Sequence, residues 1–164
     1  MIDLIVDRIQ SGINYEMGTG SPYYSDYLLE FVTNRNITFA DPNKSVAVLE
    51  GESEPVEFEI SNRISQTKEK FTVKIYLLIR GASGEETKGT RRALTQRIRH
   101  AFLRRNGNIF TNLLTTIDSG VGYEERVSKY KIARTQYDNT DIGGDFIYLA
   151  ALDIDVETEV NYTE

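Results

Sequence analysis

The chain has 164 residues, 40% of them hydrophobic and 27% charged, with a formal net charge of −6. This length favours one domain, and the absence of cysteine together with the single histidine excludes disulfides, thiolate nucleophiles and any site that needs two imidazoles. No apolar run approaches the ~18 residues of a membrane-spanning helix, and residues 1–7 carry acids where a secretory signal carries bases. We therefore expect no membrane segment, and a soluble protein of a reducing compartment or of a particle assembled there.

The charges are strongly segregated along the chain. Residues 1–60 hold eleven acids and three bases, residues 138–164 hold eight acids and no base, and residues 87–117 hold seven bases and no acid. A solvated helix face would explain the basic segment, and so would electrostatic complementarity between copies of the chain, because opposite fields steer association. Nucleic-acid binding is the third reading and the weakest, since the acidic remainder would repel a phosphate backbone.

The first forty residues predict one helix and a long irregular stretch. Ile2, Ile5, Val6, Ile9 and Ile13 recur at helical spacing, which indicates an amphipathic helix over residues 2–13. The glycine- and proline-containing run 18–22 breaks the chain. Residues 23–32 are ambiguous and could form a short helix, and residues 34–43 are typical of a loop.

Alternating apolar residues then predict strands. Val46 and Val48 suggest one short strand and residues 56–60 a second, separated by the acidic run 50–55, and residues 70–79 show the clearest alternation. A polar turn at 66–69 would join the last two as a hairpin. In that hairpin the acids Glu57 and Glu59 would face the bases Lys70 and Lys74.

A second helix is predicted over residues 85–105. Ser83 and Glu86 fit a capping box, and Leu94, Ile98, Ala101 and Phe102 form one apolar stripe. Four arginines border this stripe on its two sides: Arg92, Arg97, Arg99 and Arg104.

The last third of the chain predicts two more strands. Residues 109–129 show no clear period, residues 131–137 suggest a strand, 138–144 a turn, and 145–156 a long strand. Strands joined by tight turns are antiparallel, so we expect an α+β fold in which helices pack on one face of an antiparallel β-sheet. The whole chain, 1–164, forms a single domain in this prediction, with flexible loops at 15–43 and 106–130.

No residue pattern indicates catalysis. His100 lies on the basic helix and is more typical of an interface rim than of a general base. Asp153 and Asp155 point to the same side of one strand and could bind a cation, but a solvated strand face is the more common cause of that pattern. We therefore expect no enzyme activity, no cofactor and no metal site.

Three segments carry a family resemblance. They are the strand Glu-Lys-Phe-Thr-Val-Lys-Ile-Tyr-Leu-Leu-Ile-Arg, the helix end Ile-Arg-His-Ala-Phe-Leu, and the final Gly-Asp-Phe-Ile-Tyr-Leu-Ala-Ala-Leu-Asp-Ile-Asp-Val. Together with the short N-terminal helix, this order resembles the tail terminator (tail completion or tail-to-head joining) proteins of long-tailed bacteriophages. These are small α+β subunits that form hexameric rings on the tail tube and have no catalytic residues.

The resemblance implies a structural virion protein, assembled in the host cytoplasm, whose ring ends tube polymerisation and joins the tail to the head. Its partners would be further copies of itself, the tail tube protein below and the head connector above, with DNA passing through the lumen without sequence-specific binding. A connector protein of the neck is the nearest alternative. A metal-dependent nucleic-acid enzyme, with Asp153 and Asp155 as ligands, is the alternative of a different class. The expected subunit interface comprises Arg92, Arg97, Arg99, Arg104, Glu57, Glu59, Asp153 and Asp155.

Overall fold

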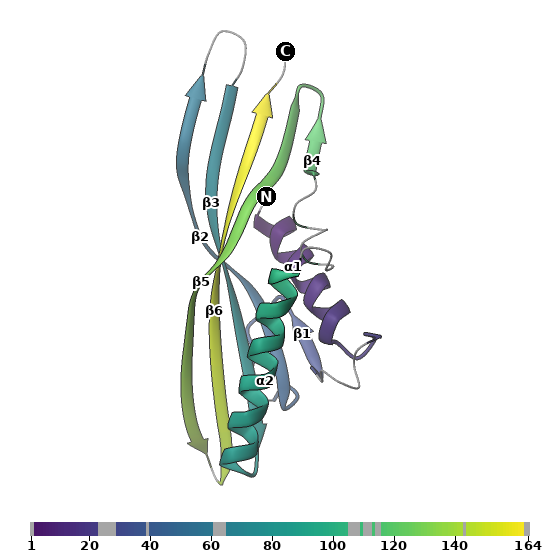
Figure 1. Cartoon of the computed structure of the whole chain (residues 1–164), viewed down its shortest axis with the longest axis vertical. Helices are drawn as coiled ribbons and strands as arrows, with labels where there is room; N and C mark the ends of the chain where they lie inside the picture. The colour runs from purple at the N-terminus through teal and green to yellow at the C-terminus, as the bar shows by residue number, and fades with distance from the viewer. Residues whose placement is uncertain are drawn as a thin grey trace.

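The computed structural model describes residues 2–22, 29–38, 40–60, 65–104, 109, 113, 116–142 and 144–162. Within these residues the chain forms two helices and a strongly twisted six-stranded sheet in the order β1-β2-β3-β6-β5-β4 (Figure 1). The elements are α1 (Ile2–Met17), β1 (Phe31–Thr33), β2 (Lys44–Ile60), β3 (Ser65–Gly81), α2 (Gly84–Leu103), β4 (Thr116–Gly120), β5 (Tyr123–Ile142) and β6 (Asp145–Tyr162).

The α+β prediction is confirmed, with one correction to the sheet. The pairings β2–β3, β3–β6, β5–β6 and β4–β5 are antiparallel, but β1 pairs in parallel with β2, so the sheet is mixed. The parallel pair arises because the stretch 34–43 carries the chain back before β2 begins. A three-residue strand has too short a pattern to be predicted from alternation.

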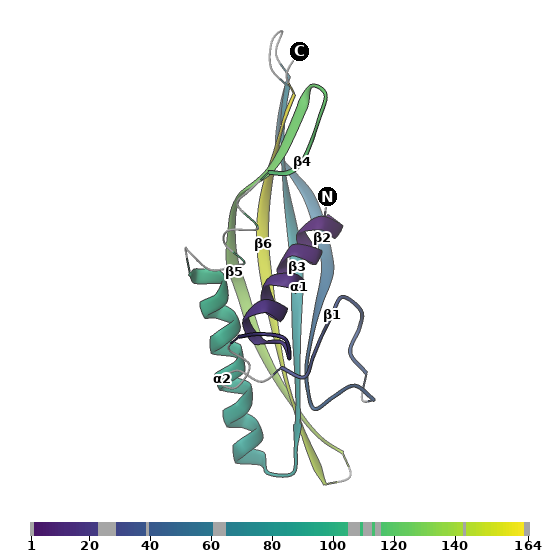
Figure 2. The same ribbon diagram turned by 90° about the vertical axis from the view of Figure 1, so that its right-hand side faces the viewer.

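Both helices cover the same face of the sheet (Figure 2). Helix α1 packs on β1 and β2, and α2 packs on β3 and β6. The predicted apolar stripes are the ones that are buried, as Ile5 and Ile9 of α1 and Ile98 of α2 are 0% exposed. They meet the residues of β3 and β6 that point to the same side, and each such aliphatic side chain contributes roughly 1.5–3 kcal/mol. We call the opposite, helix-free side of the sheet the open face.

The first hairpin corrects three predictions. β2 is one continuous strand rather than two, and it accommodates the acidic run 50–55 through register shifts between Glu50 and Ser53 and between Pro55 and Glu57. Residues 66–69 lie inside β3 and are not a turn. Glu57 lies opposite Lys68 and Glu59 opposite Gln66, so the expected register with Lys70 and Lys74 is wrong.

The C-terminal strands are longer than predicted. β5 spans Tyr123–Ile142 and β6 spans Asp145–Tyr162, where alternation indicated only 131–137 and 145–156. The glycine-rich run before β5 is the tight turn of the β4–β5 hairpin, with Gly122 at φ +83°. Parts of the two segments expected as loops, 15–43 and 106–130, are therefore regular elements.

The start of α2 differs in detail from the capping-box prediction. Ser83 stands at the N-cap position, but its side chain makes no capping hydrogen bond. Instead the Thr87 hydroxyl and amide both donate to the Ser83 carbonyl, at 2.6 and 3.0 Å. Thr87 is buried, so its hydroxyl is satisfied inside the first turn of the helix.

Candidate assembly surfaces

The four arginines of α2 that were predicted to lie at an interface divide into two pairs. Arg92 is exposed and Arg99 is half-buried, so both reach the surface of the helix layer. Arg97 and Arg104 turn toward α1, where Arg97 Nη2 lies 2.7 Å and Arg104 Nη1 3.5 Å from Glu16 Oε2. Arg97 is withdrawn from the surface, with 11% of its side chain exposed, whereas Arg104 keeps 39% exposed beside Glu16.

Glu16 is the acid that the sequence analysis missed. Its side chain is 1% exposed, and the ion pair with Arg97 neutralises it between the two helices. A buried carboxylate needs such a partner, because transferring its charge out of water costs several kcal/mol. The signal was present: Glu16 follows Ile9 by seven residues and Ile13 by three, which places it on the buried stripe of α1.

Arg91 is a second buried charge that was counted only as part of the basic segment. Its Nη1 donates to the Asp138 and Leu149 carbonyls and to Asn139 Oδ1, at 3.1, 3.2 and 2.6 Å. The guanidinium also stacks 4.9 Å from the ring centroids of Tyr137 and Tyr148. Arg91 therefore ties α2 to the β5–β6 hairpin and is withdrawn from the surface.

The acids of β6 are neutralised within the open face. Asp155 lies 3.3 Å from Lys70 and accepts a hydrogen bond from Thr72, and Glu157 lies 2.8 Å from Lys129. Glu159 contacts bases on both neighbouring strands, at 3.7 and 3.4 Å. The register alternates bases of β3 and β5 with acids of β6, so the acidic C-terminal region presents little net negative charge.

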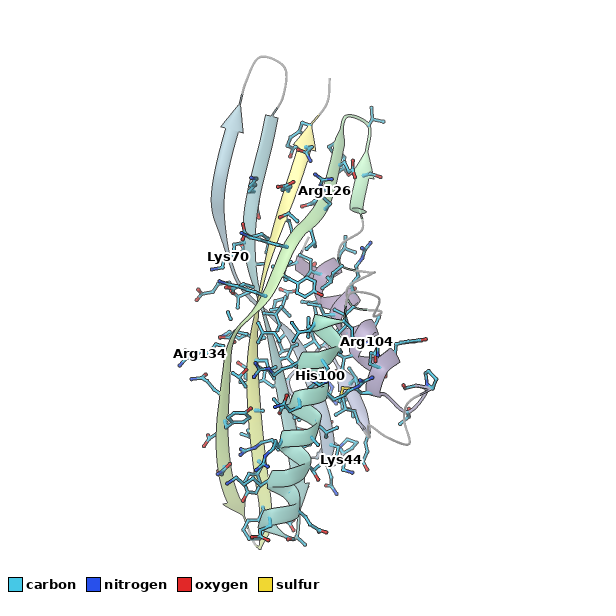
Figure 3. The ribbon with its side chains drawn as sticks, in the orientation of Figure 1. Lys44, Lys70, His100, Arg104, Arg126 and Arg134 are labelled. Atoms are coloured by element: carbon cyan, nitrogen blue, oxygen red, sulfur yellow. The ribbon has the colours of Figure 1, made fainter. Side chains whose placement is uncertain are left out.

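Three further bases of the open face add positive charge to it. Lys74, Lys131 and Arg134 form no ion pair with any described residue, and Lys131 and Arg134 are exposed. Asp153 lies beside Lys74 and Arg134 in the register. Figure 3 shows Lys70 and Arg134 on the side of the sheet away from the helices, whereas His100 and Arg104 lie on α2.

An apolar hollow of about 640 Å³ lies next to these bases on the open face. Leu49, Tyr76, Leu149 and Ala151 line its floor, and Ile37, in the stretch between β1 and β2, lines its wall. Tyr76 is 39% exposed, a large aromatic surface left to solvent. By the strand register, Lys74 and Arg134 lie beyond one end of the hollow, and Asp138 lines its other end. The open face therefore has an apolar centre with cations on one side of it.

Another group of exposed acids lies around α1 and β2, where Asp3, Asp7 and Glu50 border a second hollow together with Leu49 and Asn36. Asp3, Asp7, Glu50 and Glu52 are all exposed there, and we call them the acidic patch. A hydrogen bond with Asp3, and the repulsion of its carboxylate, raise the pKa of Glu50. The side chains of Glu57 and Glu59, farther along β2, lie outside the described part of the chain.

The residues considered for chemistry are not brought together. His100 is exposed on α2, and Asp153 and Asp155 lie on the open face among lysines. Among the described residues there is no group of three or more acidic or histidine side chains that could hold a metal ion. Within the same residues, no helix is long and apolar enough to cross a membrane.

Comparison with known proteins gives little more than a distant likeness of shape. No family model and no curated protein matches the chain. One solved chain, from a structure titled "Virion of native gene transfer agent (GTA) particle", is 8% identical with a TM-score of 0.42, over 93% of this chain and 97% of that one. Another is 13% identical with a TM-score of 0.43, over 95% of each chain. Both scores lie below 0.5, so neither match assigns a function.

Proposed function

We propose that the chain is a structural protein of a phage-type virion, and more narrowly a subunit of the ring that ends tail-tube growth and joins the tail to the head. The element order that suggested this family is present in the fold, as a helix, a long hairpin, a second helix and a closing hairpin. The proposal gives the chain no catalytic role. Its neighbours would be the tail tube protein and the head connector, with DNA in the lumen.

The observation that carries the proposal is the charge polarity of the subunit. The acidic patch lies on α1 and β2, while Arg92 and Arg99 lie on α2, which Figure 2 shows on the β5 side of the helix layer. A ring is a closed set of heterologous contacts, in which one surface of each copy meets a different surface of the next. Two surfaces of opposite sign favour that contact and oppose the symmetric one, which would bring like charges together.

Of the four predicted interface arginines, the test reverses the two that do not pair with Glu16. Wild type should run as one closed oligomer near six copies at low salt, measured by native mass spectrometry across protein concentration. Arg92→Glu with Arg99→Glu should give a folded monomer, because each contact then brings like charges together, and high salt should loosen the wild-type ring. Arg97 is left unchanged because its reversal would break the buried pair with Glu16.

A matched control reverses two exposed acids at the start of the same helix, Glu85→Arg with Glu86→Arg, and should leave the oligomer intact. A wild-type protein that stays monomeric at every concentration, also with its tail tube partner, would contradict the ring. A double arginine variant that forms normal rings at low salt would show that α2 is merely solvated.

A further inference from the structure

The open face has the features of a docking surface rather than of a solvated sheet. Its centre is the apolar hollow lined by Tyr76, Leu149 and Ala151, and one side of the face carries Lys74, Lys131 and Arg134 without ion pairs to described residues. A partner that fits must therefore combine apolar side chains with carboxylates on one narrow surface. A basic partner would bring like charges together at these three cations, which carry no ion pair with a described residue.

Helix α1 carries such a surface on its outward side. Leu4, Asp7, Ser11 and Tyr15 recur at helical spacing and are all exposed. Leu4 is 43% and Tyr15 48% exposed, so both present apolar surface on the outward side of the helix. Asp7 lies between them and forms no ion pair with any described residue. Asp3 is hydrogen-bonded to Glu50 and is not part of this stripe.

We infer that the open face of one subunit receives the outward stripe of α1 of a second copy, with Leu4 in the apolar hollow and Asp7 facing Arg134 and Lys74. The inference rests on the proposed ring but gives Asp7 a partner other than Arg92 and Arg99. A ring that survives reversal of those two arginines and is lost on reversal of Arg134 therefore supports the open face as the contact. The helix layer and the open face lie on opposite sides of the subunit (Figure 1), so one copy cannot satisfy its own stripe. The contact is heterologous, and repetition carries it from copy to copy until the ring closes.

Chemical cross-linking tests this contact directly, because the wild-type chain has no cysteine. The double variant Leu4→Cys with Ala151→Cys places one thiol on each proposed surface, and a short bismaleimide should join neighbouring copies. Denaturing electrophoresis should then show a ladder that ends at the size of the native ring. The control pairs Ala151→Cys with Leu103→Cys, since Leu103 is an equally apolar and 68% exposed residue of the other helix, and it should give no ladder.

The outcomes separate this contact from the ring itself. A ladder in the Leu4 variant alone supports the inference. A normal ring by native mass with no ladder, or with dimers only, overturns the inference and leaves the proposed function standing. A chain that forms no oligomer even as wild type overturns both.

A charge swap supplies an independent readout that does not depend on thiol geometry. Asp7→Lys and Arg134→Glu should each raise the concentration for half-assembly by about 5-fold per contact, and the double variant should restore it. Asp145→Lys, which reverses an exposed acid at the far end of β6, is the control and should have no effect. Single variants without effect, or a double variant no better than either single one, would overturn the pairing.

Discussion

Removal of the buried carboxylate between the two helices should strongly destabilise the fold. In Glu16→Ala, the guanidinium of Arg97, whose side chain is 11% exposed, loses the partner that lies 2.7 Å away. Removing one partner of a buried ion pair costs about 3–5 kcal/mol. Because a domain of this size loses roughly 2–4 °C of melting temperature per kcal/mol, the midpoint should fall by roughly 6–20 °C.

Urea denaturation followed by circular dichroism measures this loss, with Arg97→Met and the double variant completing a cycle. The double variant should be more stable than Glu16→Ala alone, because it removes both charges of the buried pair. Lys129→Ala, which breaks the exposed pair with Glu157, is the control and should barely move the urea midpoint. A loss below about 1 kcal/mol in Glu16→Ala, or a double variant that is less stable than both single ones, would refute this account of the helix layer.

Three further predictions follow from single contacts. Ile98→Asp should abolish folding as judged by circular dichroism, because the Ile98 side chain is 0% exposed between α2 and the sheet. A soluble, folded variant would show that the apolar stripe of α2 does not face the sheet. Gly12→Ala should lower the melting temperature, since the new Cβ would lie 2.4 Å from Ile109 Cγ1. In Gly89→Ala the new Cβ meets no atom within 4 Å, so this variant should stabilise α2 by about 1 kcal/mol. Equal effects of the two substitutions would contradict the close approach at Gly12. The hydrogen bond from Arg35 lowers the pKa of Asp41 to about 2, so the pair stabilises the loop above pH 4 and is lost as the pH falls toward 2. In Arg35→Gln, a carboxyl NMR titration should show the pKa of Asp41 rising toward its ordinary value but staying below it, because the Thr38 amide still donates to this carboxylate.

The elements with an uninterrupted pattern could be predicted from the sequence. The stripe of α1 is complete in residues 2–13, that of α2 around Ile98, and β3 alternates without a break through residues 70–79. In each case one face of the element contacts the core and the other contacts solvent. Apolar residues then recur with the period of the helix or strand, and this period can be recognised in the sequence.

Only residues 131–137 of β5 were predicted, and the rest of the strand was missed for a physical reason. It lies near the edge of the sheet, and only Val127, Tyr130 and Ile132 of its central part contact the core, so most of its positions have no reason to be apolar. The register shifts at Val127 and Ile132 further disrupt the alternation. β2 was divided in two for a similar reason, since its own register shifts fall within an acidic stretch.

The assembly surfaces could be predicted only in outline. Counting charges along the chain correctly located a basic helix, but it could not show that Arg91 and Arg97 are turned inward. The number of acids in the C-terminal region suggested a negative surface there, and this was wrong. The lysines that neutralise Asp155 and Glu157 come from β3 and β5, which are distant in sequence. Net charge at a surface depends on strand register, which composition does not contain.

The position of β6 in the middle of the sheet also constrains how the chain folds. Each hairpin is local, but β3 joins β6 by pairing Ser65 with Tyr162 and Gly81 with Phe146. Such long-range pairing forms slowly, and during synthesis it must wait until the last strand has left the ribosome. Until then the apolar stripe of α2 has only half of its sheet to cover it. Truncation within β6 should therefore leave a chain that aggregates, rather than a smaller folded domain.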